Sequence, residues 1–138
     1  MRSLIRDSIV LPAAAEVLYG IYLDSKKHSE FTGTPVTIST EPGSPFSAFD
    51  GAISGTMIAA VPFRLVVQSW RSTRFGAGDP DSTLILAFVP EGAEGRIDLI
   101  HLDVPESDHQ GVAEGWNKYY WTPWRKYLTK AASVRAAG

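Results

Sequence analysis

The chain has 138 residues, with 13 Lys and Arg against 15 Asp and Glu, and a formal net charge of −2. This length suits one domain, and a hydrophobic content of 44% is that of a globular chain rather than a disordered one. The near-neutral charge argues against a nucleic-acid partner, which ordinarily requires a basic surface. The sequence has no cysteine, which excludes disulfides, thiolate nucleophiles and cysteine-ligated zinc, and a reducing compartment fits best. We therefore expect a single domain over residues 1–138.

No segment has the composition of a targeting signal or a membrane span. Arg2, Arg6 and Asp7 interrupt the apolar residues near the N-terminus, where a signal peptide needs an unbroken apolar stretch. No run approaches the roughly 20 apolar residues of a membrane helix. We expect a cytoplasmic protein without membrane insertion.

The first part of the chain predicts one strand followed by two short helices. Pro12 suits the first turn of a helix, where its missing N–H leaves no bond unmade. Asp24 or Ser25 is the expected N-cap of the second helix, which Gly33 is expected to end. The expected bounds are 3–11 for the strand, and 13–23 and 26–31 for the helices.

Between Pro35 and Val104 the hydrophobic pattern has a period of two, which is typical of half-buried strands. Asp50-Gly51 is the strongest hairpin signal in the chain, and Pro62 ends the strand that follows it. Because short turns join consecutive strands, we expect an antiparallel meander rather than a parallel sheet. The expected strands are 36–40, 46–49, 52–61, 63–71, 82–89 and 96–102.

One long amphipathic helix is predicted over residues 111–132. At about 100° per residue, its apolar and charged side chains separate onto two arcs. Pro123 is expected to kink the helix or to free one of its carbonyls, and residues 133–138 are expected to fray. The apolar arc comprises Val112, Trp116, Tyr119, Tyr120, Pro123, Trp124, Tyr127 and Leu128.

These elements together predict an α+β helix-grip fold. A sheet with one apolar face must cover that face, and the long aromatic helix is the only element large enough to do so. We expect a curved antiparallel sheet of about six to seven strands around this helix, with two short helices after the first strand.

Several motifs, together spanning residues 3–130, resemble the AHSA-like family, named for activators of a heat-shock chaperone ATPase, within the START-like (SRPBCC) superfamily. Phe75 departs from the resemblance, because relatives often have a tryptophan there. The eukaryotic activators also carry a separate chaperone-binding domain that 138 residues leave no room for, so we do not carry over the family name as a function. The matching segments are Pro12–Tyr19, His28–Gly33, Phe46–Gly55, Val67–Arg71, His101–Pro105 and, most specifically, Gly111–Trp121.

The resemblance implies a cavity between the sheet and the C-terminal helix, which in the wider superfamily often holds an apolar ligand. Our leading hypothesis is therefore a binding protein for a small hydrophobic molecule, with no cofactor. The alternative for the aromatic helix is an ordinary filled core. The cavity candidates are Gln68, Trp70, Leu99, His101, Trp116, Asn117, Tyr120 and Trp124.

Catalytic and metal chemistry find little support in the sequence. The three histidines, His28, His101 and His109, have no recognised ligand spacing, and no nucleophile or phosphate-binding motif occurs. We assign no catalytic residue and no metal site. A cyclase or hydrolase that uses His101 is the least favoured alternative, and a histidine that only satisfies a hydrogen bond of the fold is the simpler interpretation.

Charge is distributed unevenly along the chain. Residues 79–114 contain nine acids and only Arg96, whereas residues 115–138 contain five bases and no acid. An acidic edge and a basic helix back offer a surface for a protein partner, either a chaperone or a second copy of the chain. A solvated sheet beside a helix whose charges suit its dipole explains the same pattern.

Overall fold

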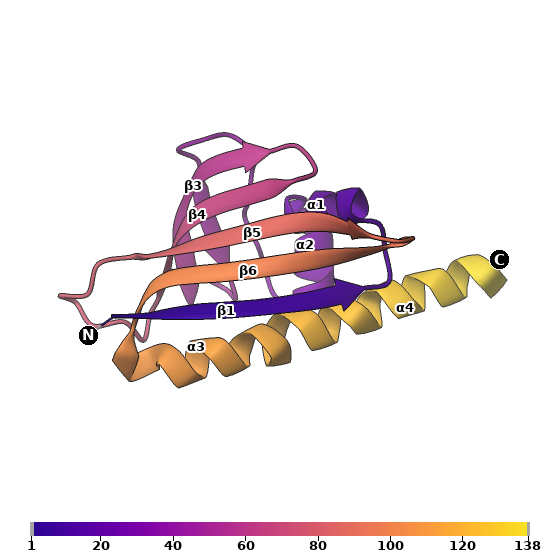
Figure 1. The fold of residues 1–138 in the computed structure, drawn as a ribbon. Helices are drawn as coiled ribbons and strands as arrows, with labels where there is room; N and C mark the ends of the chain where they lie inside the picture. Colours follow the sequence, from indigo (N-terminus) through magenta and orange to yellow (C-terminus); the bar gives the residue numbers. More distant parts are fainter. Residues whose placement is uncertain (1, 138) are drawn as a thin grey trace.

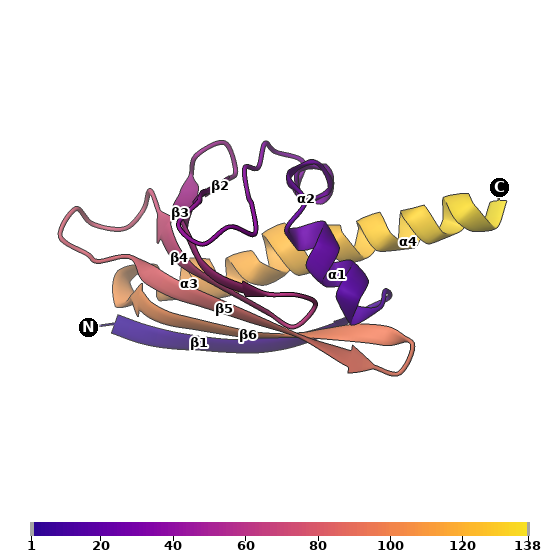
Figure 2. The same ribbon diagram turned by 90° about the horizontal axis from the view of Figure 1, so that it is seen from above.

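The computed structural model describes residues 2–137, with side chains described for residues 3–132. Six antiparallel strands form one sheet in the order β1-β6-β5-β4-β3-β2. Figure 1 shows a long helical run lying across the sheet, and Figure 2 shows two short helices on the same side of it. The expected helix-grip fold class is confirmed.

The twelve elements occur in the order that the sequence predicts, with three differences described below. The short element η1 is a 3-10 turn, and η2 is a segment of π-helix. The bounds are β1 Arg2–Leu11, α1 Ala15–Tyr22, α2 Ser25–Thr32, β2 Pro45–Ala48, β3 Ile53–Val61, β4 Leu65–Ser72, β5 Ser82–Glu91, β6 Glu94–Pro105, η1 Glu106–Asp108, α3 His109–Gly115, η2 Trp116–Trp121 and α4 Thr122–Ala137.

Local signals place the second helix correctly. The carboxylate of Asp24 accepts a hydrogen bond from the backbone N–H of Lys27 at 3.0 Å, so Asp24 is the N-cap of α2. Gly33 follows α2 with a φ of 79°, in the left-handed region where a residue without a Cβ is unstrained. Both caps agree with the sequence prediction.

The prediction of a strand over residues 36–40 is wrong. A single bridge between Thr37 and Ser47 is the only sheet contact described there. The segment is tied instead to α2, because the hydroxyls of Ser25 and Ser29 accept hydrogen bonds from two of its N–H groups at 3.0 and 2.9 Å. Alternation of side chains alone did not show that this segment lacks a partner strand.

The last hairpin is tighter and longer than expected. Gly92 and Ala93 alone form its turn, and Gly92 has a φ of 62°. Strand β6 then continues to Pro105 and pairs along its length with β1, the first strand of the chain. This pairing brings residues about one hundred positions apart side by side.

The predicted C-terminal helix is interrupted by a π-helical segment. At its end, the N–H of Thr122 donates to the carbonyl of Asn117, five residues earlier. Pro123 follows at once and has no N–H to continue the ordinary pattern. The irregularity expected at Pro123 therefore takes the form of η2, on the N-terminal side of the proline.

The π-helical segment changes which residues face the sheet. Trp121 lies five positions after Trp116, about 140° away on an ordinary helix, yet both are buried and their rings stack at 5.5 Å. Tyr119, which the regular helix places on the apolar arc, is 49% exposed. Asn117, predicted as a cavity residue, is also exposed. These assignments were wrong because they assumed a constant angle per residue.

Residues 133–138 were expected to fray. The backbone of α4 continues as helix to Ala137, whereas the side chains from Ser133 onward and all of Gly138 lie outside the described residues.

Candidate functional site

The space under the middle of the helical run is filled by stacked rings. Trp124, fully buried, stacks on Phe31 with ring centroids 4.5 Å apart. His28 also stacks on Phe31 at 5.1 Å, and the Tyr22 ring lies 4.7 Å from that of His28. Here the structure has the aromatic core that the sequence left open as an alternative to a cavity.

A groove of about 520 Å³ lies instead at the N-terminal end of the helical run. The turn between β2 and β3 forms one side of it, the end of β4 the second, and α3 with most of η2 the third. Five aromatic side chains line it: Phe49, Trp70, Trp116, Tyr119 and Tyr120.

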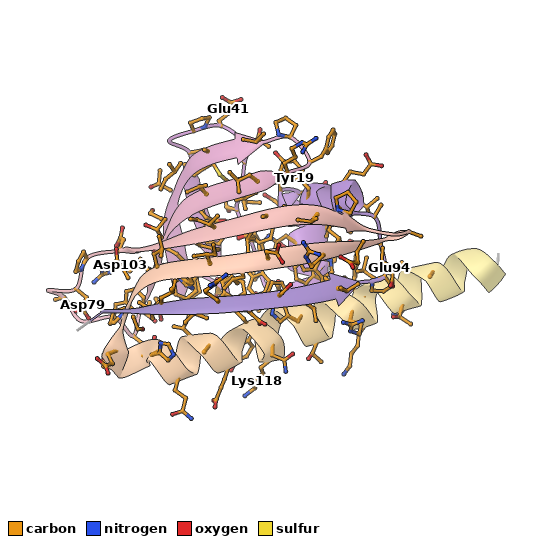
Figure 3. All side chains as sticks on the ribbon, in the orientation of Figure 1. Tyr19, Glu41, Asp79, Glu94, Asp103 and Lys118 are labelled. Atoms are coloured by element: carbon orange, nitrogen blue, oxygen red, sulfur yellow. The ribbon has the colours of Figure 1, made fainter. Side chains whose placement is uncertain are left out.

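Charged side chains surround this aromatic lining. Arg74 and Lys118 contribute two positive charges, and Asp108 and Glu114 contribute two negative charges. The ammonium group of Lys118, which projects from the helical run in Figure 3, lies 5.2 Å from the centre of the Tyr119 ring. The groove thus combines apolar ring surfaces with a mixed polar rim, as small-molecule sites commonly do.

His101 lies behind the groove and is fully buried. Its Nδ1 is 3.2 Å from the indole Nε1 of Trp116, and its Nε2 is 2.9 Å from the hydroxyl of Ser82. Burial lowers the pKa of His101 to about 3. Both ring nitrogens are engaged, and His101 is absent from the groove lining, so it has no direct route to a molecule bound there.

His28 has the equivalent place behind Tyr120. Its Nδ1 is 2.7 Å from the carbonyl oxygen of Tyr22, and its Nε2 is 2.9 Å from the hydroxyl of Tyr120. Burial lowers the pKa of His28 to about 4, against the opposing effect of the bond to the Tyr22 carbonyl. Burial also raises the pKa of Tyr120. The hydrogen bond to His28 holds the hydroxyl end of this ring from inside the core.

Three of the eight predicted cavity residues line the groove: Trp70, Trp116 and Tyr120. Gln68, Leu99, His101 and Trp124 are buried in the core and do not line it. The Oε1 of Gln68 accepts a hydrogen bond from the hydroxyl of Tyr22 at 2.6 Å. Asn117 is exposed and lies outside the groove.

Phe49, Ile53 and Arg74 line the groove as well, and none of them was predicted from the sequence. Phe49 was expected to end the strand over residues 46–49, whereas the structure places it in the turn that follows β2. It has a φ of 53°, and its ring lies 5.7 Å from those of Tyr119 and Tyr120. Contact between this turn and η2 depends on the curvature of the sheet, for which the sequence carries no local signal.

The acidic stretch does not gather on one edge. Figure 3 shows Asp79 and Asp103 at the end of the sheet where α3 begins, and Glu94 at the opposite end. Arg96 neutralises part of the stretch, because it pairs with Glu91 at 2.7 Å and Asp98 at 3.0 Å.

Two kinds of feature are absent from the described residues. No helix within residues 2–137 has the length and apolar character needed to cross a membrane. No group of three or more His, Asp or Glu side chains among the described residues is arranged to hold a metal ion.

Solved structures with the same fold include two that are named for chaperone activators. An HSP90 activator from Plasmodium falciparum superposes with a TM-score of 0.82 at 18% identity, covering 91% of this chain and 96% of that one. The Aha1 dimer from Colwellia psychrerythraea has a TM-score of 0.74 at 11% identity, covering 87% of this chain and 92% of that one. At these identities the likeness concerns the fold.

Sequence comparison identifies the family. "Activator of 90 kDa heat shock protein ATPase homolog 2" from Mus musculus is 28% identical over 105 residues, which are 76% of this chain and 31% of that protein. This chain therefore spans less than a third of the curated relative. The family model described as "Activator of Hsp90 ATPase homolog 1-like protein" matches residues 12–129. The chain belongs to this family, as the resemblance in its motifs indicated.

Proposed function

We propose that the protein, acting as one domain, binds a small apolar molecule with a ring system in the groove. The observation that carries this proposal is the groove itself, because about 520 Å³ lined by five aromatic side chains lies within the range of small-molecule sites. The leading hypothesis from the sequence is thus kept, but the site moves from beneath the middle of the helix to its N-terminal end.

Filling the groove tests the proposal. Gly115 lines the groove in an ordinary helical conformation, and a Cβ placed on it meets only the Tyr119 ring at 3.5 Å. Gly115→Leu should therefore occupy the groove without unfolding the chain. We expect it to weaken binding of the fluorescent probe 8-anilinonaphthalene-1-sulfonate at least about tenfold, a loss of about 1.4 kcal/mol.

The matched control is Gly20→Leu, the same change at an exposed helical glycine in α1 with no atom within 4 Å of its added Cβ. Fluorescence titration compares the two variants with the wild-type protein, and circular dichroism checks their folding. Equal probe affinity in G115L and the wild type, or no binding to the wild type, would count against a ligand site in this groove.

A second candidate is a protein-interaction module that modulates a chaperone ATPase. The names of the relatives support it, and so does the exposed side of the helical run, where Lys118, Arg125 and Lys126 lie. We expect K118E/K126E to abolish stimulation of an Hsp90-type ATPase, whereas K26E/K27E, an equal charge reversal on exposed positions of α2, retains it. Absence of stimulation by the wild-type protein would contradict this candidate.

Other expectations from the sequence stay predictions. A homodimer is one expected partner, and the Colwellia psychrerythraea structure is described as a dimer. Sedimentation of this chain over a range of concentrations tests it. A cytoplasmic location and the absence of a cofactor also stay predictions, and we propose no reaction for His101.

A further inference from the structure

We propose that His28 and His101 are positioning residues of the groove. Each accepts a hydrogen bond, through one ring nitrogen, from the polar group of an aromatic side chain that lines the groove. His101 holds Trp116 in this way and His28 holds Tyr120. The test of this inference by ligand affinity rests on the proposed function, whereas its test by the Trp116 indole signal does not.

The direction of each bond at His101 follows from Ser82. The Ser82 hydroxyl has one proton, which it donates to the backbone carbonyl of Trp70 at 2.5 Å. Toward His101 it can only accept, so Nε2 of His101 carries the proton. The Nδ1 of the neutral ring then has a free lone pair, and the indole N–H of Trp116 donates to it at 3.2 Å.

The same reasoning fixes His28 in the opposite tautomer. The carbonyl oxygen of Tyr22 can only accept, so the Nδ1 of His28, 2.7 Å away, carries the proton. Its Nε2 is left with a lone pair, to which the hydroxyl of Tyr120 donates at 2.9 Å. With pKa values lowered to about 4 and 3 by burial, both histidines are neutral near pH 7.

This arrangement has a consequence for what the groove offers a ligand. The single N–H of Trp116 and the single O–H of Tyr120 are both directed into the core, toward histidine nitrogens. On the helix side the groove therefore presents these two rings by their apolar surfaces, without the hydrogen-bond donors that free indole and phenol groups would add. The bound molecule should place its apolar part here.

Matched amide variants separate the two nitrogens of each histidine. An Asn side chain places its amide near the position of Nδ1, and a Gln side chain near that of Nε2. H101N thus keeps an acceptor for Trp116 and loses the donor to Ser82, whereas H101Q does the reverse. At His28 the order is inverted: H28Q keeps the acceptor for Tyr120, and H28N keeps only the donor to the Tyr22 carbonyl.

The first measurement needs no ligand. In a ¹⁵N–¹H spectrum, the indole signal of Trp116 is the one that Trp116→Phe removes. We expect this signal to move more in H101Q than in H101N, because only H101Q removes its acceptor. A role of His101 in overall stability alone would predict equal movement in both variants, and equal movement would overturn the assignment for His101.

The second measurement is affinity for 8-anilinonaphthalene-1-sulfonate, taken on variants that circular dichroism shows to be folded. H101Q and H28N each lose the hydrogen bond that holds the ring, so we expect them to bind the probe at least about fivefold more weakly than H101N and H28Q respectively. Adding Tyr120→Phe should suppress most of the H28N defect, since no hydroxyl is then left unpaired.

The outcomes separate this inference from the proposed function. If the wild-type protein binds no probe, the proposed function fails while the indole signal still decides the role of His101. If the wild-type protein binds the probe but each Asn and Gln pair has equal affinity, the groove is a ligand site and the histidines do not position it.

Discussion

At the residue scale, the two buried histidines tie the stability of the fold to pH in the acidic range. Each is neutral in the folded protein because burial lowers its pKa, to about 4 for His28 and about 3 for His101. In the unfolded chain both return to about 6.5. Below that pH the unfolded state binds more protons than the folded state, so acid favours unfolding.

We predict that the free energy of unfolding is constant between about pH 7 and pH 9 and falls as the pH decreases from 6.5 towards 4 and then 3. The loss from His28 alone should be on the order of 3 kcal/mol. Urea denaturation at a series of pH values measures it. H28Q, which has no imidazole at this position, should show a shallower decrease, and a slope equal to that of the wild type would contradict the prediction.

The stability of the fold also depends on the absence of a side chain at Gly55. A Cβ at this position would lie 1.9 Å from the backbone carbonyl oxygen of Ser69, which no flexible side chain can relieve. We predict that Gly55→Ala lowers the free energy of unfolding by at least about 1–3 kcal/mol. Gly78→Ala, where an added Cβ meets no atom within 4 Å, should be nearly neutral in the same denaturation experiment.

At the element scale, the free edge of β1 is closed by side chains. The carboxylate of Asp7 accepts hydrogen bonds from the backbone N–H of Ser8 at 2.8 Å and from the indole N–H of Trp121 at 2.9 Å. The guanidinium group of Arg125 donates to the carbonyl of Val10 at 2.8 Å. These contacts occupy backbone groups that would otherwise be free to pair with another strand.

We predict that Asp7→Ala opens this edge. Two donors, the N–H groups of Ser8 and Trp121, lose their acceptor, and the chain should associate at concentrations where the wild type does not. Sedimentation velocity measures the association. Glu41→Ala, which removes an exposed acid away from β1, serves as the control, and equal behaviour of the two variants would refute the prediction.

The sequence predicted the elements whose determinants are local and missed those that depend on a partner. Asp24 and Gly33 cap the two ends of α2 through contacts within a few residues, so both caps could be predicted from the sequence. The burial of Trp121 and the exposure of Asn117 were not predicted, because both follow from the π-helical turn, which depends on packing against the sheet. The groove was missed for the same reason: its sides come from three separate parts of the chain.

At the scale of the whole molecule, stability should be uneven. Strands β1, β6 and β5 pair along most of their length, whereas β2 has four residues and lies at the far edge of the sheet. The segment before β2 joins the sheet only by the bridge between Thr37 and Ser47 and by two backbone hydrogen bonds between residues 43–44 and Met57, among the described residues. Regions with few such contacts open locally at low free energy.

We predict that the backbone amides of β2 exchange with solvent faster than those of β5, as measured by hydrogen exchange and NMR. Because Phe49, Ala52 and Ile53 of the groove adjoin β2, a molecule bound in the groove should slow exchange there more than in β5. Equal exchange rates across the sheet, or exchange that the bound molecule slows only in β5, would show that the groove is not formed by the less stable part of the fold.

The tryptophan ladder of the helical run also gives the protein an optical signature. Trp116 stacks on Trp121 at 5.5 Å and Trp121 on Trp124 at 6.4 Å, with interplanar angles of 25° and 24°. Indoles this close and this rigidly held couple their electronic transitions, so the near-ultraviolet circular dichroism should carry a strong signal that vanishes when the helix leaves the sheet. Because Trp116 also lines the groove, a molecule bound there should change that signal, which needs no label.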